Sequence, residues 1–244
     1  MQAFRTPRIL FEDNHILLAV KAPGLPSQAG RSGRPDMLGL LERDLAQRAG
    51  KPGRAFLGLV HRLDQPTSGL MVFAKTSKAA SRLSQAFRDR QVKKLYLATC
   101  RGLPQESQGH MKDRLSRQEV EGRVQVLEGQ EGYEACLDWQ VLEVDKEKGE
   151  SLLLLDLITG RRHQIRVQLA SRGLSLLGDR RYGLMDARDQ EVPTLALHAC
   201  GLSFPHPTLK EAMTFWLGPD INPSFSKRDQ EVFDHYLKSL EKET

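Results

Sequence analysis

Apolar residues recur along the chain with the periods of strands and amphipathic helices. Residues Ile9–Val20 alternate as a strand or hairpin does, and the apolar runs Leu70–Ala74 and Ser151–Ile158 predict buried strands. The second run is too apolar to face solvent, which predicts a central strand of a sheet. Apolar positions from Met37 to Leu45 share one helical face, and Gly50 is expected to end that helix.

Polar and turn-forming residues separate these elements. The polar stretch Pro104–Gly122 has no period and predicts an exposed loop, and Gln28–Pro35, rich in Gly and Arg, predicts a mobile one. Ser77 is expected to cap a helix that buries Leu83 and Ala86. The other predicted elements are a turn at Pro66–Gly69, strands at Tyr96–Ala98, Tyr133–Val144 and Leu195–Phe204, a helix at Gln164–Arg172 closed by Gly173, and a terminal helix at Val232–Leu240.

This order of elements defines a fold class. Paired strands with scattered helices and no internal repeat predict a mixed α+β fold. We expect a single domain over the 244 residues, with a core of about residues 9–220 and a C-terminal helical tail of about residues 226–241.

The positive charge of the chain is concentrated in two segments. A formal net charge of +5 and a pI near 9.2 favour a polyanionic partner. Six arginines lie between Arg161 and Tyr182 against one acid, Asp179, and a second basic segment runs from Arg82 to Lys94. With 39% hydrophobic and 27% charged residues, neither a disordered chain nor a membrane protein is favoured.

Cysteine and histidine spacing gives no sign of a metal or a disulfide framework. Cys100, Cys136 and Cys200 are far apart, which fits a reduced cytoplasm. His61, His163 and His198 lack metal-ligand spacing and are expected to be structural hydrogen bonders. No phosphate-binding or dinucleotide-binding glycine motif is present, so we expect no cofactor and no metal.

The segment His61–Gly69 carries the clearest chemical signal. It reads H-R-L-D-Q-P-T-S-G, with an acid at a strand-to-turn junction beside small residues. Alone, Asp64 would be read as a turn or cap aspartate. Four further motifs follow: Lys94–Tyr96 (K-L-Y), Thr159–Arg166 (T-G-R-R-H-Q-I-R), Gly178–Gly183 (G-D-R-R-Y-G) and Leu197–Pro207 (L-H-A-C-G-L-S-F-P-H-P).

In this order the motifs resemble those of the RluA-type family of RNA pseudouridine synthases. The resemblance implies a mixed, mostly antiparallel sheet with flanking helices and an active-site cleft across the sheet. It also implies isomerisation of uridine to pseudouridine without a cofactor, with Asp64 as the nucleophile. The sequence leaves open whether Asp64 attacks the ribose or the uracil ring.

The resemblance assigns roles to further residues. Tyr96, which alone would be read as a core aromatic, is expected to stack on the target base and to place its hydroxyl for proton transfer. Arg166 is expected to form a bidentate salt bridge that keeps Asp64 charged.

RNA contacts are expected from a separate group of basic side chains. Arg62 is expected to contact RNA or to fill the gap left by the flipped base, Lys94 to contact RNA, and Arg161 and Arg162 to contact phosphates. The implied partner is tRNA or rRNA, bound by a monomer in the cytoplasm away from membranes. We expect the catalytic core without the small N-terminal RNA-binding domain that many members of the family carry, so that RNA selection rests on that core.

Two positions depart from the family pattern. Gln168 stands where histidine is common, and Ser175 where proline is common, which leaves the subgroup and the accepted RNA open. Two other readings stay open at this point. A noncatalytic RNA-binding protein would explain the arginines, and a glycoside hydrolase would use Asp64 with Asp156 or Asp179 as its carboxylate pair.

Overall fold

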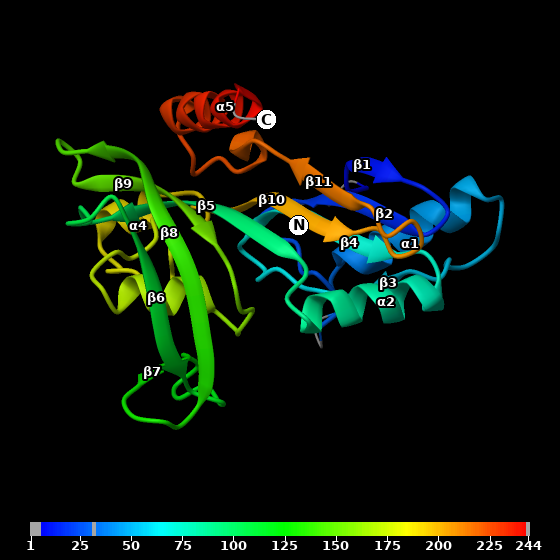
Figure 1. The fold of residues 1–244 in the computed structure, drawn as a ribbon, viewed down its shortest axis with the longest axis horizontal. Coiled ribbons are helices and arrows are strands. Elements are labelled where there is room, and N and C mark those ends of the chain that lie inside the picture. Colours follow the sequence, from blue (N-terminus) through cyan, green and yellow to red (C-terminus); the bar gives the residue numbers. More distant parts are fainter. Residues whose placement is uncertain (1–5, 31–32, 243–244) are drawn as a thin grey trace. The chain divides into compact units, whose positions relative to one another are not determined.

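The computed structural model describes residues 6–30 and 33–242, whose contacts group into two compact units (Figure 1). Within that range, unit 1 takes in the chain up to Lys93 together with Gly201–Leu217, and unit 2 takes in Lys94–Cys200 and the chain from Gly218 onward. Arg31 and Ser32 of the predicted mobile loop lie outside the described residues.

Unit 1 contains antiparallel strands and two helices. Its strand order is β1-β2-β4-β10, with β3 paired to β4 and β11 paired to β10, and the first four residues of β10, Leu197–Cys200, belong to unit 2. Every residue of β2 and β4 is buried, which explains their continuous apolar sequences and confirms the predicted hairpin and buried strand. The bounds are β1 Ile9–Glu12, β2 Ile16–Lys21, β3 Gly58–Leu59, β4 Ser68–Ala74, β10 Leu197–Pro205, β11 Ala212–Trp216, α1 Met37–Arg48 and α2 Ser77–Arg88.

The helices of unit 1 begin at side-chain caps. Thr76, in an extended conformation, accepts a hydrogen bond from the backbone N–H of Ala79 and caps α2. The predicted cap at Ser77 is therefore wrong by one residue, because Ser77 is already helical. Helix α1 ends at Arg48, and Gly50 follows with φ +63°, which confirms the predicted end.

Unit 2 is built on the antiparallel strand order β5-β9-β8-β6-β7. Strand β9 lies between β5 and β8, which confirms the predicted central strand. Helix α5 packs on β8 and buries Phe233. The bounds are β5 Lys93–Arg101, β6 Gln108–Leu115, β7 Val126–Leu127, β8 Tyr133–Asp145, β9 Glu150–Asp156, α3 Gln164–Ala170, α4 Ala187–Glu191, a 3-10 helix at Pro219–Ile221 and α5 Lys227–Lys242.

The predicted exposed loop at Pro104–Gly122 is wrong, because it contains strand β6. Met111 and Leu115 are buried on the inward face of β6, but Asp113 occupies the inward position between them. Asp113 is partly buried because Arg172 binds it through two hydrogen bonds of 2.9 and 3.0 Å. A charged residue at an inward position hides the alternation by which strands are recognised.

The predicted turn at Pro66–Gly69 lies two residues too late in the chain. The N–H of Thr67 donates to the carbonyl of Asp64 (3.0 Å), and β4 already begins at Ser68. The turn is therefore Asp64–Thr67, with the candidate nucleophile as its first residue. Strands β7 and β11 and helix α4 were not predicted. Together the two units confirm an α+β fold with a mixed, mostly antiparallel sheet. Among the described helices none is long and apolar enough to cross a membrane.

Candidate active site

The turn that carries Asp64 is bound on its buried side by a lysine side chain. Lys21, the last residue of β2, is fully buried, and its Nζ donates to the carbonyls of Gln65 (2.9 Å), Thr67 (2.5 Å) and Ala22 (3.1 Å). Two of these carbonyls belong to the turn itself. Lys21 therefore fixes the backbone of the turn from which the Asp64 side chain projects.

A second set of contacts fixes the chain on both sides of Asp64. The backbone N–H of Leu63 donates to the Ser27 hydroxyl (3.1 Å), which in turn donates to the Leu63 carbonyl (2.7 Å). Gly24 and Gln65 are joined by a backbone bond of 2.9 Å and a side-chain bond of 3.1 Å. The segment Lys21–Ser27 thus clamps the turn, and it includes Gly24 at φ +82°.

His61 has a structural role in unit 1. Its Nε2 accepts a hydrogen bond from the Val72 N–H (3.0 Å), and its ring stacks on Phe87 at 4.8 Å between centroids. This ties the start of the H-R-L-D segment to β4 and α2. Arg62 is exposed and Asp64 partly exposed, so their side chains point away from this support.

Burial lowers the pKa of Lys21 from its usual 10.5 to about 7, and the negative charge of Asp64 opposes that shift. Between these two pH values the unfolded chain holds a proton that the folded chain has released. The free energy of unfolding should therefore rise with pH between about 7 and 10, and this contribution should be flat below pH 7.

Lys21→Met is expected to abolish that pH-dependent contribution and to lower the free energy of unfolding by about 2–4 kcal/mol, because the carbonyls lose the N–H groups of Lys21, three in its ammonium form and two in its neutral form. Urea unfolding of both proteins from pH 6 to pH 10 measures the difference, in which the other titrating groups cancel. Lys75→Met is the matched control, since Lys75 binds Glu12 (2.7 Å) and the Asp13 carbonyl but not the turn. An unchanged pH slope in Lys21→Met would contradict the assignment.

In unit 2 a buried ion pair organises the second group of candidate residues. Arg166 in α3 donates through Nε and Nη2 to the two carboxylate oxygens of Asp179, at 2.8 and 2.6 Å. Asp179 also accepts the backbone N–H groups of Arg181 (2.9 Å) and Tyr182 (3.0 Å). The G-D-R-R-Y-G motif is thus a carboxylate-centred turn that holds the guanidinium of Arg166.

The charge state of Asp179 follows from this environment. Burial alone would raise its pKa, but the hydrogen bonds and charge of Arg166 and the two backbone donors hold the pKa below its usual range. Arg166 also lies over the ring of Tyr182, 5.2 Å from its centroid. An acid that stays ionised cannot act as the proton donor of a glycoside hydrolase, so in a pair with Asp64 only the role of nucleophile or base would be left to Asp179.

The T-G-R-R-H-Q-I-R motif forms a compact loop at the start of α3. The Gln164 side chain turns back, so that its Oε1 accepts from the Thr159 hydroxyl (2.7 Å) and from the Arg161 N–H (3.0 Å). His163 adopts φ +53°, and its Nδ1 lies 3.0 Å from the Tyr182 hydroxyl. This geometry leaves the Arg161 and Arg162 side chains exposed and directs Arg166 into the unit.

The other predicted residues of unit 2 lie on β5. Tyr96 is 7% exposed and is paired in register with Leu155 of β9. Lys94 is half-buried near the start of the same strand. Unit 2 therefore holds Lys94, Tyr96, Arg161, Arg162 and Arg166, and unit 1 holds Arg62 and Asp64; the bridge between Arg166 and Asp64 stays a prediction.

The two departures from the family pattern are buried. The Gln168 amide donates to Asp113 (2.6 Å) and to the Ala135 carbonyl (3.2 Å), so it joins α3 to strands β6 and β8. The Ser175 carbonyl accepts the Arg101 N–H at 2.9 Å. Both have structural contacts within unit 2. In the described part of the chain, no group of three or more His, Cys, Asp or Glu side chains is placed to hold a metal ion.

Comparisons with known proteins define the class as an RNA-modifying isomerase. The model of the family described as RNA pseudouridylate synthase matches residues 15–171. The chain is 34% identical over 209 residues to the dual-specificity RNA pseudouridine synthase RluA of Escherichia coli (strain K12), covering 85% of this chain and 90% of that protein. It is 35% identical over 216 residues to the ribosomal large subunit pseudouridine synthase D of Zymomonas mobilis, covering 85% and 67%.

A solved structure agrees with these relatives. The human protein RNA Pseudouridylate Synthase Domain Containing 1 matches with a TM-score of 0.72 and 27% identity over 96% of this chain and 97% of that one. The chain belongs to the RNA pseudouridine synthase family. This confirms the family resemblance and the isomerase activity predicted from the motifs. It speaks against the alternative in which the chain is a noncatalytic RNA-binding protein.

Sequence reasoning missed two residues that position the site. Lys21 ends an apolar strand, and a charged residue directly after five buried positions was the available signal. Asp179 was noted as the lone acid of a basic segment, as part of the G-D-R-R-Y-G motif and as a carboxylate of the glycoside hydrolase alternative, but not as the partner of Arg166. An acid among six arginines is a natural candidate for a buried ion pair, and the structure gives it one.

Proposed function

We propose that this protein isomerises specific uridines of structured tRNA or rRNA in the cytoplasm, as a monomer, with Asp64 as the nucleophile. The observation that carries the proposal is the clamped turn, in which Lys21 and Ser27 fix the backbone around a partly exposed carboxylate. A rigid, partly exposed acid is what nucleophilic catalysis requires. One relative is named for dual specificity and another for the large ribosomal subunit, which supports a structured cellular RNA as substrate.

The reaction balances without a cofactor or metal. The bond between uracil nitrogen 1 and ribose carbon 1′ breaks, a bond from carbon 1′ to uracil carbon 5 forms, carbon 5 loses its proton, and nitrogen 1 gains one. Asp64 either attacks the ribose or adds to the uracil ring, and both routes keep the base attached to the enzyme or held beside it. The target uridine must leave its stack to reach the carboxylate, so base flipping is part of the proposal.

The remaining roles complete the proposed site. Arg166, fixed by Asp179, serves as the counter-ion that keeps Asp64 charged, and Tyr96 stacks on the target base. Arg62 contacts RNA beside the flipped base, and Lys94, Arg161 and Arg162 contact phosphates. Arg161 and Arg162 are supported in this role by their exposure.

The proposed function is tested with RNA whose uridines carry tritium at carbon 5. Formation of pseudouridine releases that tritium to water, so release from tRNA and rRNA of cells lacking the gene measures the activity. Chemical mapping of pseudouridine in the same RNA names the modified position. We expect EDTA-treated enzyme to release tritium and to form no free uracil. Release of uracil would indicate a glycoside hydrolase. If neither the tRNA nor the rRNA released tritium, the proposal would be overturned.

Tyr96→Phe is expected to bind RNA normally and to lower the single-turnover rate about 100-fold, because the ring remains for stacking while the hydroxyl is lost. Rates of tritium release at saturating RNA measure this. Tyr236→Phe in α5 is the matched control and should turn over like the wild type. Equal rates for Tyr96→Phe and wild type would limit Tyr96 to a stacking role.

A further inference from the structure

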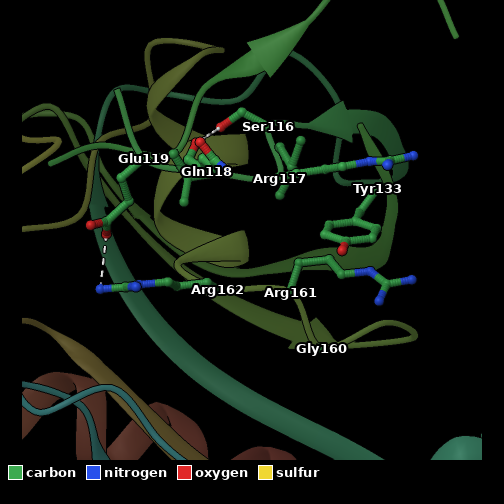
Figure 2. Close-up of a pocket in the computed structure, with 10 residues that line it drawn as sticks. Ser116, Arg117, Gln118, Glu119, Tyr133, Gly160, Arg161 and Arg162 are labelled. Carbon is green, nitrogen blue, oxygen red and sulfur yellow. Dashed lines mark hydrogen bonds and ion pairs between the residues drawn. The ribbon is translucent and has the colours of Figure 1, made fainter. Parts of the chain in front are cut away.

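Unit 2 contains a pocket of about 580 Å³ that none of the proposed catalytic residues line. Figure 2 shows its residues: the loop after β6 contributes Arg117 and Glu119, the start of β8 contributes Tyr133, and the loop before α3 contributes Arg161 and Arg162. The volume lies within the range of small-ligand sites and far exceeds what a single phosphate group occupies. The pocket is therefore large enough for a nucleotide.

Two arginines are stacked on the tyrosine at the pocket. The guanidinium carbons of Arg117 and Arg161 lie 5.5 and 5.2 Å from the centroid of the Tyr133 ring, and Figure 2 shows the two side chains running along opposite sides of that ring. Cation–π contact orients a guanidinium without using its N–H donors. The arrangement is thus a preformed stack with donors directed outward.

The hydrogen bonds of the stack leave most of these donors available. Arg161 uses Nε to bind the Glu134 carbonyl (2.9 Å), which fixes the side chain and leaves its terminal nitrogens. Arg117 is exposed and makes no hydrogen bond or ion pair to any residue in the part of the chain that the structure describes. Tyr133 is 46% exposed although it is a large aromatic residue.

The charge of the pocket favours an anion. Glu119 is its acidic lining residue, and one of its oxygens already accepts from Arg162 (3.0 Å) and Arg181 (3.1 Å). The charges of Arg117 and Arg161 are not balanced by this carboxylate. A ligand with both negative charge and a flat ring fits such a site, since guanidinium planes stack on bases and bind phosphate oxygens.

We propose that the pocket binds one unpaired nucleotide of the substrate RNA, outside the isomerised uridine. Its base stacks on the outer face of one of the two guanidinium groups supported by Tyr133, and the other arginines among Arg117, Arg161 and Arg162 bind the adjoining phosphates. The proposal rests on the proposed function, which supplies RNA as the ligand. Stacking is indifferent to base identity, so the pocket selects RNAs with an unpaired nucleotide at this position rather than a particular sequence.

Cross-linking tests the location independently of catalysis. A fluorescent hexauridylate that contains 4-thiouridine is irradiated with the full-length protein, and tryptic peptides are examined by mass spectrometry. We expect attachment to the pocket, in the peptides spanning residues 115–123 or 124–146, and loss of this product in Tyr133→Leu, which removes the support of the two guanidinium groups. Cross-links confined to other peptides would overturn the proposal, whether or not the protein isomerises uridine.

Binding measurements test the contribution of the arginines. Arg117→Gln is expected to weaken hexauridylate binding roughly threefold to tenfold and to reduce the salt slope of affinity by about 0.7. Arg123→Gln removes the same charge from an exposed residue that does not line the pocket, and it should change both quantities less. Tritium release at saturating RNA should stay unchanged in both variants, while the KM for RNA rises in Arg117→Gln.

Two outcomes contradict the proposal and leave the proposed function intact. Equal effects of Arg117→Gln and Arg123→Gln would reduce the pocket to general surface charge. If inorganic phosphate displaced hexauridylate at a phosphate concentration similar to the hexauridylate concentration that half-saturates the protein, and Tyr133→Leu bound hexauridylate as the wild type does, the pocket would be a simple anion site. Failure of the proposed function is recognised separately, because wild-type protein would then release no tritium from any RNA pool.

Discussion

Asp64→Asn is expected to lower the rate of tritium release by at least about 10⁴-fold, the largest effect of any single change in this chain. An amide has the size of a carboxylate but cannot act as the nucleophile. The contacts that hold the turn involve the carbonyls of Asp64, Gln65 and Thr67, which asparagine leaves in place. Folding and RNA affinity should therefore be preserved.

The measurement for Asp64→Asn pairs single-turnover tritium release with RNA binding and thermal unfolding. Asp89→Asn, at the exposed end of α2, is the control for loss of one negative charge. Wild-type affinity with no turnover is the expected combination. Turnover within tenfold of wild type would exclude Asp64 as the nucleophile.

Arg166→Lys is expected to reduce turnover at saturating RNA about 100-fold while RNA affinity and its salt dependence change little. Lysine keeps the charge but cannot reproduce the planar fork that binds both oxygens of Asp179 at 2.8 and 2.6 Å. A phosphate contact would give the opposite pattern, with weaker binding, a salt slope smaller by roughly one unit and normal turnover at saturation.

Arg172→Lys is a closely matched control for Arg166→Lys. Arg172 follows the same helix and forms the same kind of two-pronged bond, to Asp113 at 2.9 and 3.0 Å, but its side chain is 35% exposed. It should retain turnover. If both lysine variants lose activity equally, the effect lies in the packing of α3 and not in the position of the Arg166 guanidinium.

The pH dependence of the free energy of unfolding shows what Arg166 contributes to the buried pair that it forms with Asp179. In the wild type the lowered pKa of Asp179 contributes stability above the usual aspartate pKa of about 3.9, and this contribution is lost as pH falls through the folded-state value. In Arg166→Met, burial is opposed only by the two backbone donors, so the pKa of Asp179 should rise. Stability should then fall as pH increases above about 4, the reverse of the wild-type slope, by an amount that urea unfolding can measure.

The family and its candidate residues could be predicted because the motifs and their order are visible in the sequence itself and do not depend on knowing the fold. The apolar runs of β2, β4 and β9 predicted buried strands, because positions covered on both faces leave a continuous apolar sequence. Strand β6 was missed because Asp113 on its inward face is neutralised by Arg172, a partner 59 residues away.

The contacts that support the candidate site could not be predicted from the sequence for a similar reason. The partner of Arg166 is 13 residues away, across a loop whose path decides which of several nearby charges it meets. The Arg117–Tyr133–Arg161 stack depends on the register that places Leu115 opposite Tyr133. Local patterns report which side chains are buried, whereas pairing between distant segments requires the register and the loops.

The three buried cysteines give the molecule an internal reporter. Cys100, Cys136 and Cys200 are all buried and all belong to unit 2, and burial raises the pKa of Cys100 to about 12. A protonated thiol without solvent access does not react with maleimide or disulfide reagents. Thiol labelling of Cys100 and Cys136 in the native protein therefore proceeds only through transient opening of unit 2, and its rate records the local stability of that unit. Cys200 lies on β10, which both units share, so its labelling also responds to opening of that strand.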